Sequence, residues 1–114
     1  MKQYQHPTLD QITLPNVLHA LSDPVRLSYV QCLARLSCEQ ACGAIPTTVA
    51  KSTMSHHLRV LREAGVIHIR TEGTQSLTSL RWDDLEKKFP GVLNAVLNAA
   101  NETTVVKDKG VLVN

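Results

Sequence analysis

The chain has 114 residues, of which 43% are hydrophobic and only 4% aromatic, so we expect one domain with an aliphatic core. No apolar run approaches the ~18 to 20 residues that a membrane helix needs, and the first ten residues lack the apolar stretch of a signal peptide. The formal net charge of +2 excludes a strongly basic or acidic chain. These features predict a cytoplasmic protein with one domain at residues 1–100 and a C-terminal tail of uncertain order at residues 101–114.

The first third of the chain predicts a loose arm at residues 1–8, followed by helices. A first helix is expected at about Leu9–Leu21. It is firm only from Pro15, because proline suits a first helical turn and disrupts a helix interior. Ser22 and Asp23 are favourable N-cap residues for a second helix at residues 24–36.

The next segment predicts a short helix, a turn and a longer helix. Ser37 is expected to cap a third helix over Cys38–Ala44. After a turn at residues 47–50, a strong helix is expected over Lys51–Ala64. Its apolar side chains recur at helical spacing and define one face, formed by Met54, Leu58, Leu61 and Ala64.

Residues 66–70 and 75–80 are rich in β-forming side chains, and Glu72-Gly73 between them is typical of a hairpin turn. Further helices are expected at residues 82–89 and from Pro90 onward. Helices followed by a hairpin and a final helix indicate a mainly α fold with a small β-hairpin, arranged as a winged helix-turn-helix.

Positive charge is concentrated in residues 51–81, which hold five basic and two acidic side chains, a net charge of +3. The major groove of DNA admits a helix whose exposed side chains hydrogen-bond to base edges and phosphates. A hairpin tip beside such a helix would reach the adjacent minor groove or backbone. We therefore predict double-stranded DNA as a partner, with the binding residues Lys51, Ser52, Thr53, Ser55, His56, Arg59, Arg62, Arg70, Gly73 and Gln75.

Two segments resemble the signature stretches of the ArsR-type (ArsR/SmtB) regulators. These are Ala-Leu-Ser-Asp-Pro-Val-Arg-Leu at residues 20–27, and residues 52–67 with Ser-His-His-Leu and Leu-Arg-Glu-Ala-Gly. The resemblance covers roughly residues 15–100. It implies a homodimeric winged-helix repressor whose first and last helices form the dimer interface. Such a repressor would bind an inverted-repeat operator until an inducer releases it.

The chain departs from the metal-sensing members that it resembles. Those members carry Cys-x-Cys in the third helix, whereas three residues separate Cys38 from Cys42 here. Residues 82–100 contain no histidine, so the zinc site of other members is absent and no metal site is expected.

The cysteines Cys32, Cys38 and Cys42 are candidate sensor thiols. In the cytoplasm they should be reduced, and their odd number argues against a fully paired disulfide set. Cys32 is expected to be a small buried hydrophobe. On a third helix Cys38 and Cys42 would share a face, and a helix start would favour thiolate at Cys38, which is therefore predicted to be the most reactive thiol. The pair either binds a thiophilic ion such as arsenite, oxidises or reacts with an electrophile, or else packs inertly, and the sequence leaves these alternatives open.

His56 and His57 point ~100° apart on a helix, which disfavours joint metal binding. His56 is expected to face DNA, and His57 to be buried or half-buried against the hairpin. No Gly-rich loop, His-Glu-x-x-His motif or nucleophile elbow supports an enzyme. The alternatives to a DNA-binding regulator are a winged-helix protein–protein interaction module, which would not need the positive charge, and a small thiol redox switch.

Overall fold

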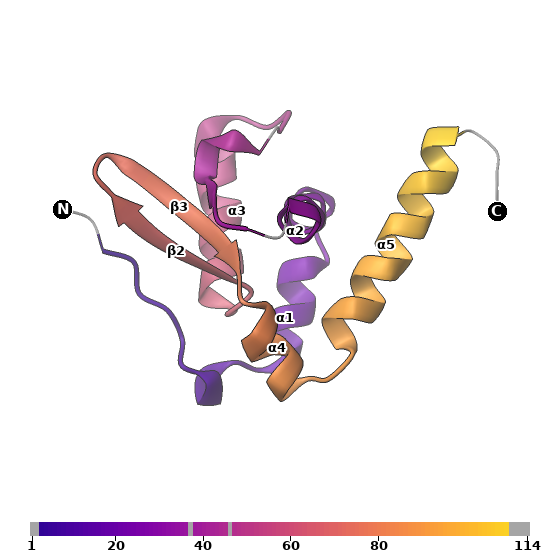
Figure 1. Ribbon diagram of the computed structural model, residues 1–114, viewed down its shortest axis with the longest axis horizontal. Helices are drawn as coiled ribbons and strands as arrows, with labels where there is room; N and C mark the ends of the chain where they lie inside the picture. Colours follow the sequence, from indigo (N-terminus) through magenta and orange to yellow (C-terminus); the bar gives the residue numbers. More distant parts are fainter. Residues whose placement is uncertain (1–2, 37, 46, 110–114) are drawn as a thin grey trace.

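The computed structural model describes residues 3–36, 38–45 and 47–109, with side chains described as far as residue 101. A bundle of helices packs on a small twisted sheet, and the last helix projects away from the body (Figure 1). In chain order the elements are the 3-10 turn η1 (Leu9–Gln11), α1 (Leu14–Leu21), α2 (Pro24–Leu36), β1 (Gln40–Ala41), the 3-10 turn η2 (Cys42–Ala44), α3 (Lys51–Glu63), β2 (Ile67–Glu72), β3 (Gln75–Leu80), α4 (Trp82–Lys88) and α5 (Val92–Lys109). This order confirms the predicted winged helix-turn-helix fold class.

The core lies where α1, α2 and α3 meet the inner face of the sheet. It is aliphatic apart from Tyr29, as the composition predicts. Its members include Val17, Ala20 and Leu21 of α1, Tyr29, Val30 and Leu33 of α2, Leu61 of α3, Ile67 and Ile69 of β2, Leu85 of α4 and Leu93 and Leu97 of α5.

The segment predicted as a third helix, Cys38–Ala44, is instead a short strand followed by a 3-10 turn, so that prediction was wrong. Gln40 and Ala41 pair with Thr78 and Leu77 of β3, which makes a three-stranded antiparallel sheet in the order β1-β3-β2. Pairing with the free edge of β3 satisfies backbone groups that a two-turn helix would otherwise satisfy. Ser37, the predicted cap, lies outside the described residues.

The C-terminal helix is longer than the sequence indicated. α5 continues to Lys109 and so includes most of the segment predicted to be a tail, whereas residues 110–114 lie outside the described residues. Leu93 and Leu97 bury its inner face, and Gln31 of α2 donates a hydrogen bond of 2.8 Å to Asn101.

Residues 3–8 of the predicted arm are docked on the body and are not loose. They run beside β2 (Figure 1), and Arg81 donates a 2.9 Å hydrogen bond to the carbonyl oxygen of Pro7. Lys88 Nζ donates to the carbonyl oxygens of Leu9, Asp10 and Ile12, at 2.6, 3.2 and 2.6 Å. The docking of the arm was not predicted, because polar residues without periodicity give no indication of long-range contacts.

Candidate nucleic-acid interface

The helix α3 has one buried face and one exposed polar face, as predicted. Met54 and Leu61 are 7% and 0% exposed and anchor the helix in the core. Ala50 at the N-cap has no side chain that caps the first-turn N–H groups, so a phosphate can approach them. The exposed face carries the predicted binding residues Lys51, Ser52, Thr53, Ser55, His56 and Arg59.

The end of α3 is set by Gly65, whose φ of +87° suits glycine. The N–H of Gly65 donates to the carbonyl oxygen of Arg62, and that of Val66 donates to Leu61, at 3.1 and 3.0 Å. This is the Schellman arrangement of a helix C-terminus. A Cβ atom at Gly65 would lie 2.5 Å from Ile12 Cδ1, so the site also needs glycine for space.

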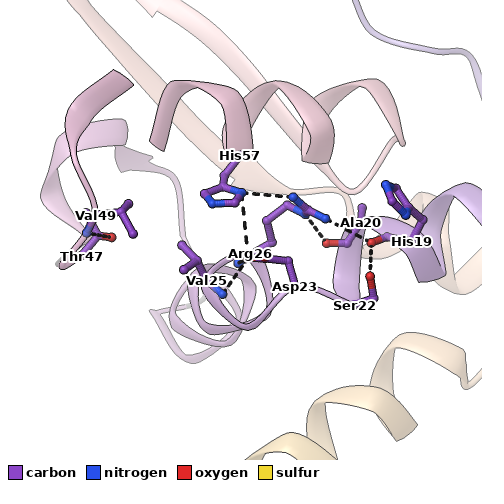
Figure 2. A network of polar contacts seen from close by, with 9 residues as sticks. All are labelled: His19, Ala20, Ser22, Asp23, Val25, Arg26, Thr47, Val49 and His57. Carbon is purple, nitrogen blue, oxygen red and sulfur yellow. Dashed lines mark hydrogen bonds and ion pairs between the residues drawn. The ribbon is translucent and has the colours of Figure 1, made fainter. Parts of the chain in front are cut away.

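A buried polar network joins α3 to the start of α2 (Figure 2). His57 is buried as predicted, but it contacts Arg26 and Asp23 of the α2 start, not the hairpin, and that part of the prediction was wrong. Arg26 Nη1 lies 3.1 Å from His57 Nδ1, and Asp23 Oδ2 lies 3.9 Å from the same nitrogen. Since a guanidinium only donates, the neutral His57 ring accepts through Nδ1.

Asp23 also caps α2. Its carboxylate accepts hydrogen bonds of 2.8 and 3.1 Å from the N–H groups of Val25 and Arg26. Desolvation raises the pKa of Asp23, but the hydrogen bonds from the N–H groups of Arg26 and Val25 and the nearby charge of Arg26 outweigh this effect, and the net pKa is lowered. The cap therefore holds a carboxylate at neutral pH.

The hairpin β2–β3 forms the wing next to α3. Its register pairs Glu72 with Gln75, and the turn at Gly73 has a φ of +61°. Gly73 and Gln75 are exposed, so both predicted wing residues are accessible. Arg70 instead makes two hydrogen bonds to Glu39, at 2.8 and 2.7 Å, which lower the pKa of Glu39 and brace the wing against the segment before β1. A DNA contact by Arg70 stays a prediction.

Two further arginines of the predicted set have protein partners. Arg59 Nε lies 3.3 Å from Glu63 Oε2, but both side chains are exposed, so this pair is weak and Arg59 is free to exchange it for DNA. Arg62 is half-buried, and its guanidinium donates to the carbonyl oxygen of Gln5 and lies over the Tyr4 ring. The sequence did not indicate this use of Arg62.

An open groove of about 1490 Å³ connects these surfaces. Its walls come from α3, the wing, the η2 turn and the N-terminal arm. Predicted binding residues from two of these walls, Ser52, Ser55, Arg59 and Gln75, line it together. The tertiary structure thus assembles helix and wing residues into one surface.

The three thiols differ in exposure and in their surroundings. Cys38 is exposed and accepts a 3.0 Å hydrogen bond from Gln40 Nε2. Cys42 is half-buried, and burial raises the pKa of its thiol, which the hydroxyl of Tyr29 opposes. Cys32 is half-buried, and Arg35 approaches its sulfur at 3.6 Å. Because the third helix does not form, Cys38 and Cys42 share no helical face, and Cys38 does not lie at a helix start.

Among the described residues, no group of three His, Cys, Asp or Glu side chains could hold a metal ion. Within the same part of the chain, no helix is long and apolar enough to cross a membrane.

Known proteins are similar to this chain in both sequence and fold. A protein-family model described as a helix-turn-helix domain matches residues 21–70. The uncharacterised HTH-type transcriptional regulator YceK of Bacillus subtilis is 34% identical over 89 residues, covering 76% of this chain and 88% of that protein. The transcriptional repressor BigR from Xylella fastidiosa superposes with a TM-score of 0.54 at 29% identity, over 67% of this chain and 85% of that chain.

A homodimeric winged helix-turn-helix domain from Mycobacterium bovis, described as a possible ArsR-family regulator, gives a TM-score of 0.59 at 27% identity. The superposition covers 79% of this chain and 82% of that domain. These relatives, the fold and the exposed face of α3 agree with the resemblance to the ArsR-type regulators that two segments of the sequence carry. The chain belongs to the ArsR-type family of winged helix-turn-helix, DNA-binding transcriptional regulators.

Proposed function

We propose that the protein is a homodimeric repressor that binds an inverted-repeat operator and is released by an inducer acting on its thiols. The observation that carries the proposal is the position of α3, whose apolar side is anchored in the core while its basic, hydroxyl-rich side lines a groove beside the wing. A helix presented in this way fits the major groove, with the wing over the neighbouring backbone.

Dimerisation is supported by apolar side chains left exposed on the single chain. Leu18 of α1 and Leu36 at the end of α2 are 45% and 48% exposed. A small domain gains stability by covering such surface with a second copy. The similar domain from Mycobacterium bovis is homodimeric. We propose that α1 and the projecting α5 form the interface, which would present two α3 helices to one face of a duplex.

Selection of duplexes from a random-sequence library by the purified protein would test DNA binding and supply a probe. The selected sequences should be inverted repeats with half-sites ~34–36 Å apart, one helical turn. Light scattering should report two chains per duplex. Inserting half a helical turn between the half-sites should abolish tight binding, and equal affinity for both spacings would refute the paired-helix geometry.

Arg59 is the residue on which base recognition is proposed to depend. Arg59→Ala should weaken binding to the selected duplex by roughly 5- to 150-fold for each of the two subunits, the range for one lost bidentate contact to guanine. Arg35→Ala is the matched control, because Arg35 is also exposed but lies outside the groove. A folded Arg59→Ala protein that binds as tightly as the parent would remove this residue from the interface.

The inducer is proposed to act at Cys38, the exposed thiol of the segment that leads into β1. A bulky adduct or a bound arsenite there would displace a segment whose Glu39 braces Arg70 of the wing. Operator affinity should be measured on reduced, oxidised and arsenite-treated protein, with Cys38→Ser, Cys42→Ser and Cys32→Ser variants. Loss of binding that Cys38→Ser prevents supports sensing, whereas unchanged affinity after all treatments refutes it.

A further inference from the structure

The first described residues form a segment without regular secondary structure that has two different faces. Side chains alternate between exposed and half-buried along Gln3, Tyr4, Gln5 and His6. Alternate side chains of an extended chain point to opposite sides. Gln3 and Gln5 therefore share the outer face, while Tyr4 and His6 face the body.

The inner face is anchored at three points. The Tyr4 hydroxyl lies 3.0 Å from Ser76 Oγ on the wing, and the Tyr4 ring centre lies 5.5 Å from the Arg62 guanidinium of α3. His6 Nε2 accepts a 2.9 Å hydrogen bond from the N–H of Ile69, on the edge strand β2. The arm is therefore held at a set distance from both α3 and the wing.

The outer face lines the groove that the predicted DNA contacts also line. Gln3 and Gln5 line it together with Ser55 and Arg59 of α3, and Tyr4 of the inner face also borders it. Glutamine amides donate hydrogen bonds to phosphate and sugar oxygens, contacts that position a protein on the duplex. A duplex seated against α3 and the wing would meet these amides.

We propose that Gln3 and Gln5 form a third DNA-contacting element, which binds backbone phosphates, and that Arg62 is a positioning residue that holds them. Arg62 donates to the Gln5 carbonyl oxygen, and its guanidinium also lies over Tyr4. Its charge thus acts on the arm, not directly on DNA. The inference rests on the DNA binding proposed above.

The test is a Gln3→Ala/Gln5→Ala double variant, measured by fluorescence anisotropy on the library-selected duplex and on an unrelated duplex of equal length. Affinity should fall by at least roughly 10-fold, since hydrogen bonds to charged groups are lost. The loss should be similar on both duplexes, because phosphate contacts carry no sequence information. The slope of log affinity against log salt should stay unchanged, because a neutral amide releases no counterion.

The control removes an exposed amide that lies outside both the groove and the proposed dimer interface, as Gln11→Ala, and should bind within twofold of the parent. Arg62→Met separates the two roles of Arg62. If it positions the arm, this change weakens binding in the parent but has less than a twofold effect in the double variant. A salt slope lowered by about 1.8 in Arg62→Met, about 0.9 for each of the two subunits, would show a direct phosphate contact and overturn the positioning role.

The outcomes separate the two proposals. If the parent selects no duplex, DNA binding as proposed fails and the arm inference fails with it. If the parent binds and the folded Gln3→Ala/Gln5→Ala variant binds within twofold, the arm inference alone is overturned. Tighter binding by that variant would show that the arm obstructs the groove, which also overturns it.

Discussion

Arg26→Met removes the guanidinium that links α1, α2 and α3, while keeping a side chain of similar length. Arg26 is 7% exposed. Its Nε donates to the carbonyl oxygen of Ala20 at 2.7 Å, and its Nη1 bonds to His57. Pro24, four residues after Ala20, has no N–H to offer that carbonyl, so a side chain is needed at this helix junction.

The cost follows from the acceptors that lose a donor. The carbonyl oxygen of His19 keeps the Ser22 hydroxyl at 2.7 Å, so its weaker bond from Arg26, at 3.3 Å, is dispensable. The carbonyl oxygen of Ala20 and Nδ1 of His57 are left without a donor, and each unsatisfied buried acceptor costs about 1–3 kcal/mol of stability. The free energy of unfolding should therefore fall by roughly 2–6 kcal/mol, with a fall in Tm of at least ~8 °C.

Urea unfolding followed by circular dichroism, at one protein concentration and pH 7, measures this difference. Arg35→Met is the control, because Arg35 lies on the same helix but is exposed, and it should change the free energy of unfolding by less than ~0.5 kcal/mol. A loss below ~1 kcal/mol for Arg26→Met would refute the view that this network holds α3 in place.

Three further predictions concern stability. Gly65→Ala should lower the free energy of unfolding by roughly 2–5 kcal/mol, because of the left-handed backbone and the clash with Ile12. Gly73→Ala, with open space around it, should lower it by only ~1–2 kcal/mol, and equal losses in chemical denaturation would contradict this. Asp23→Ala should lower the free energy of unfolding by ~0.5–2 kcal/mol at pH 7. Because the folded pKa of Asp23 lies below its unfolded value, the difference in stability from the parent should shrink as the pH falls below about 4, and a constant difference in acid would contradict this. Desolvation, aided by the charges of His68 and the nearby arginines, lowers the pKa of His6 to about 4. The stability that neutral His6 contributes should therefore be complete above pH 6.5 and lost as the pH falls toward 4. An imidazole titration by NMR with a midpoint near 6.5 would refute arm docking.

Much of the site followed from local patterns. The spacing of Met54, Leu58 and Leu61 determined which side of α3 is buried, and therefore which side presents Ser55 and Arg59. This works because a helix converts a 3.6-residue period directly into a face. The hairpin was equally predictable, since a glycine turn between two β-rich runs leaves few other arrangements.

Other features depended on partners far away in the chain. Cys38–Ala44 has helix-compatible residues, but pairing of Gln40 with Thr78 of β3 turned part of it into a strand. His57 was predictable as buried, yet only the packing of α2 against α3 decided that Arg26 and Asp23 would be its partners.

The N-terminal arm shows the limit most clearly. Its polar residues have no periodicity, so the sequence by itself determined only that no regular element forms there. Its place is decided by single contacts across 57 to 72 residues, from Arg62 to Gln5, from Ile69 to His6 and from Tyr4 to Ser76. Local periodicity determines which face of an element is buried, whereas such contacts exist only once the separate elements have packed together.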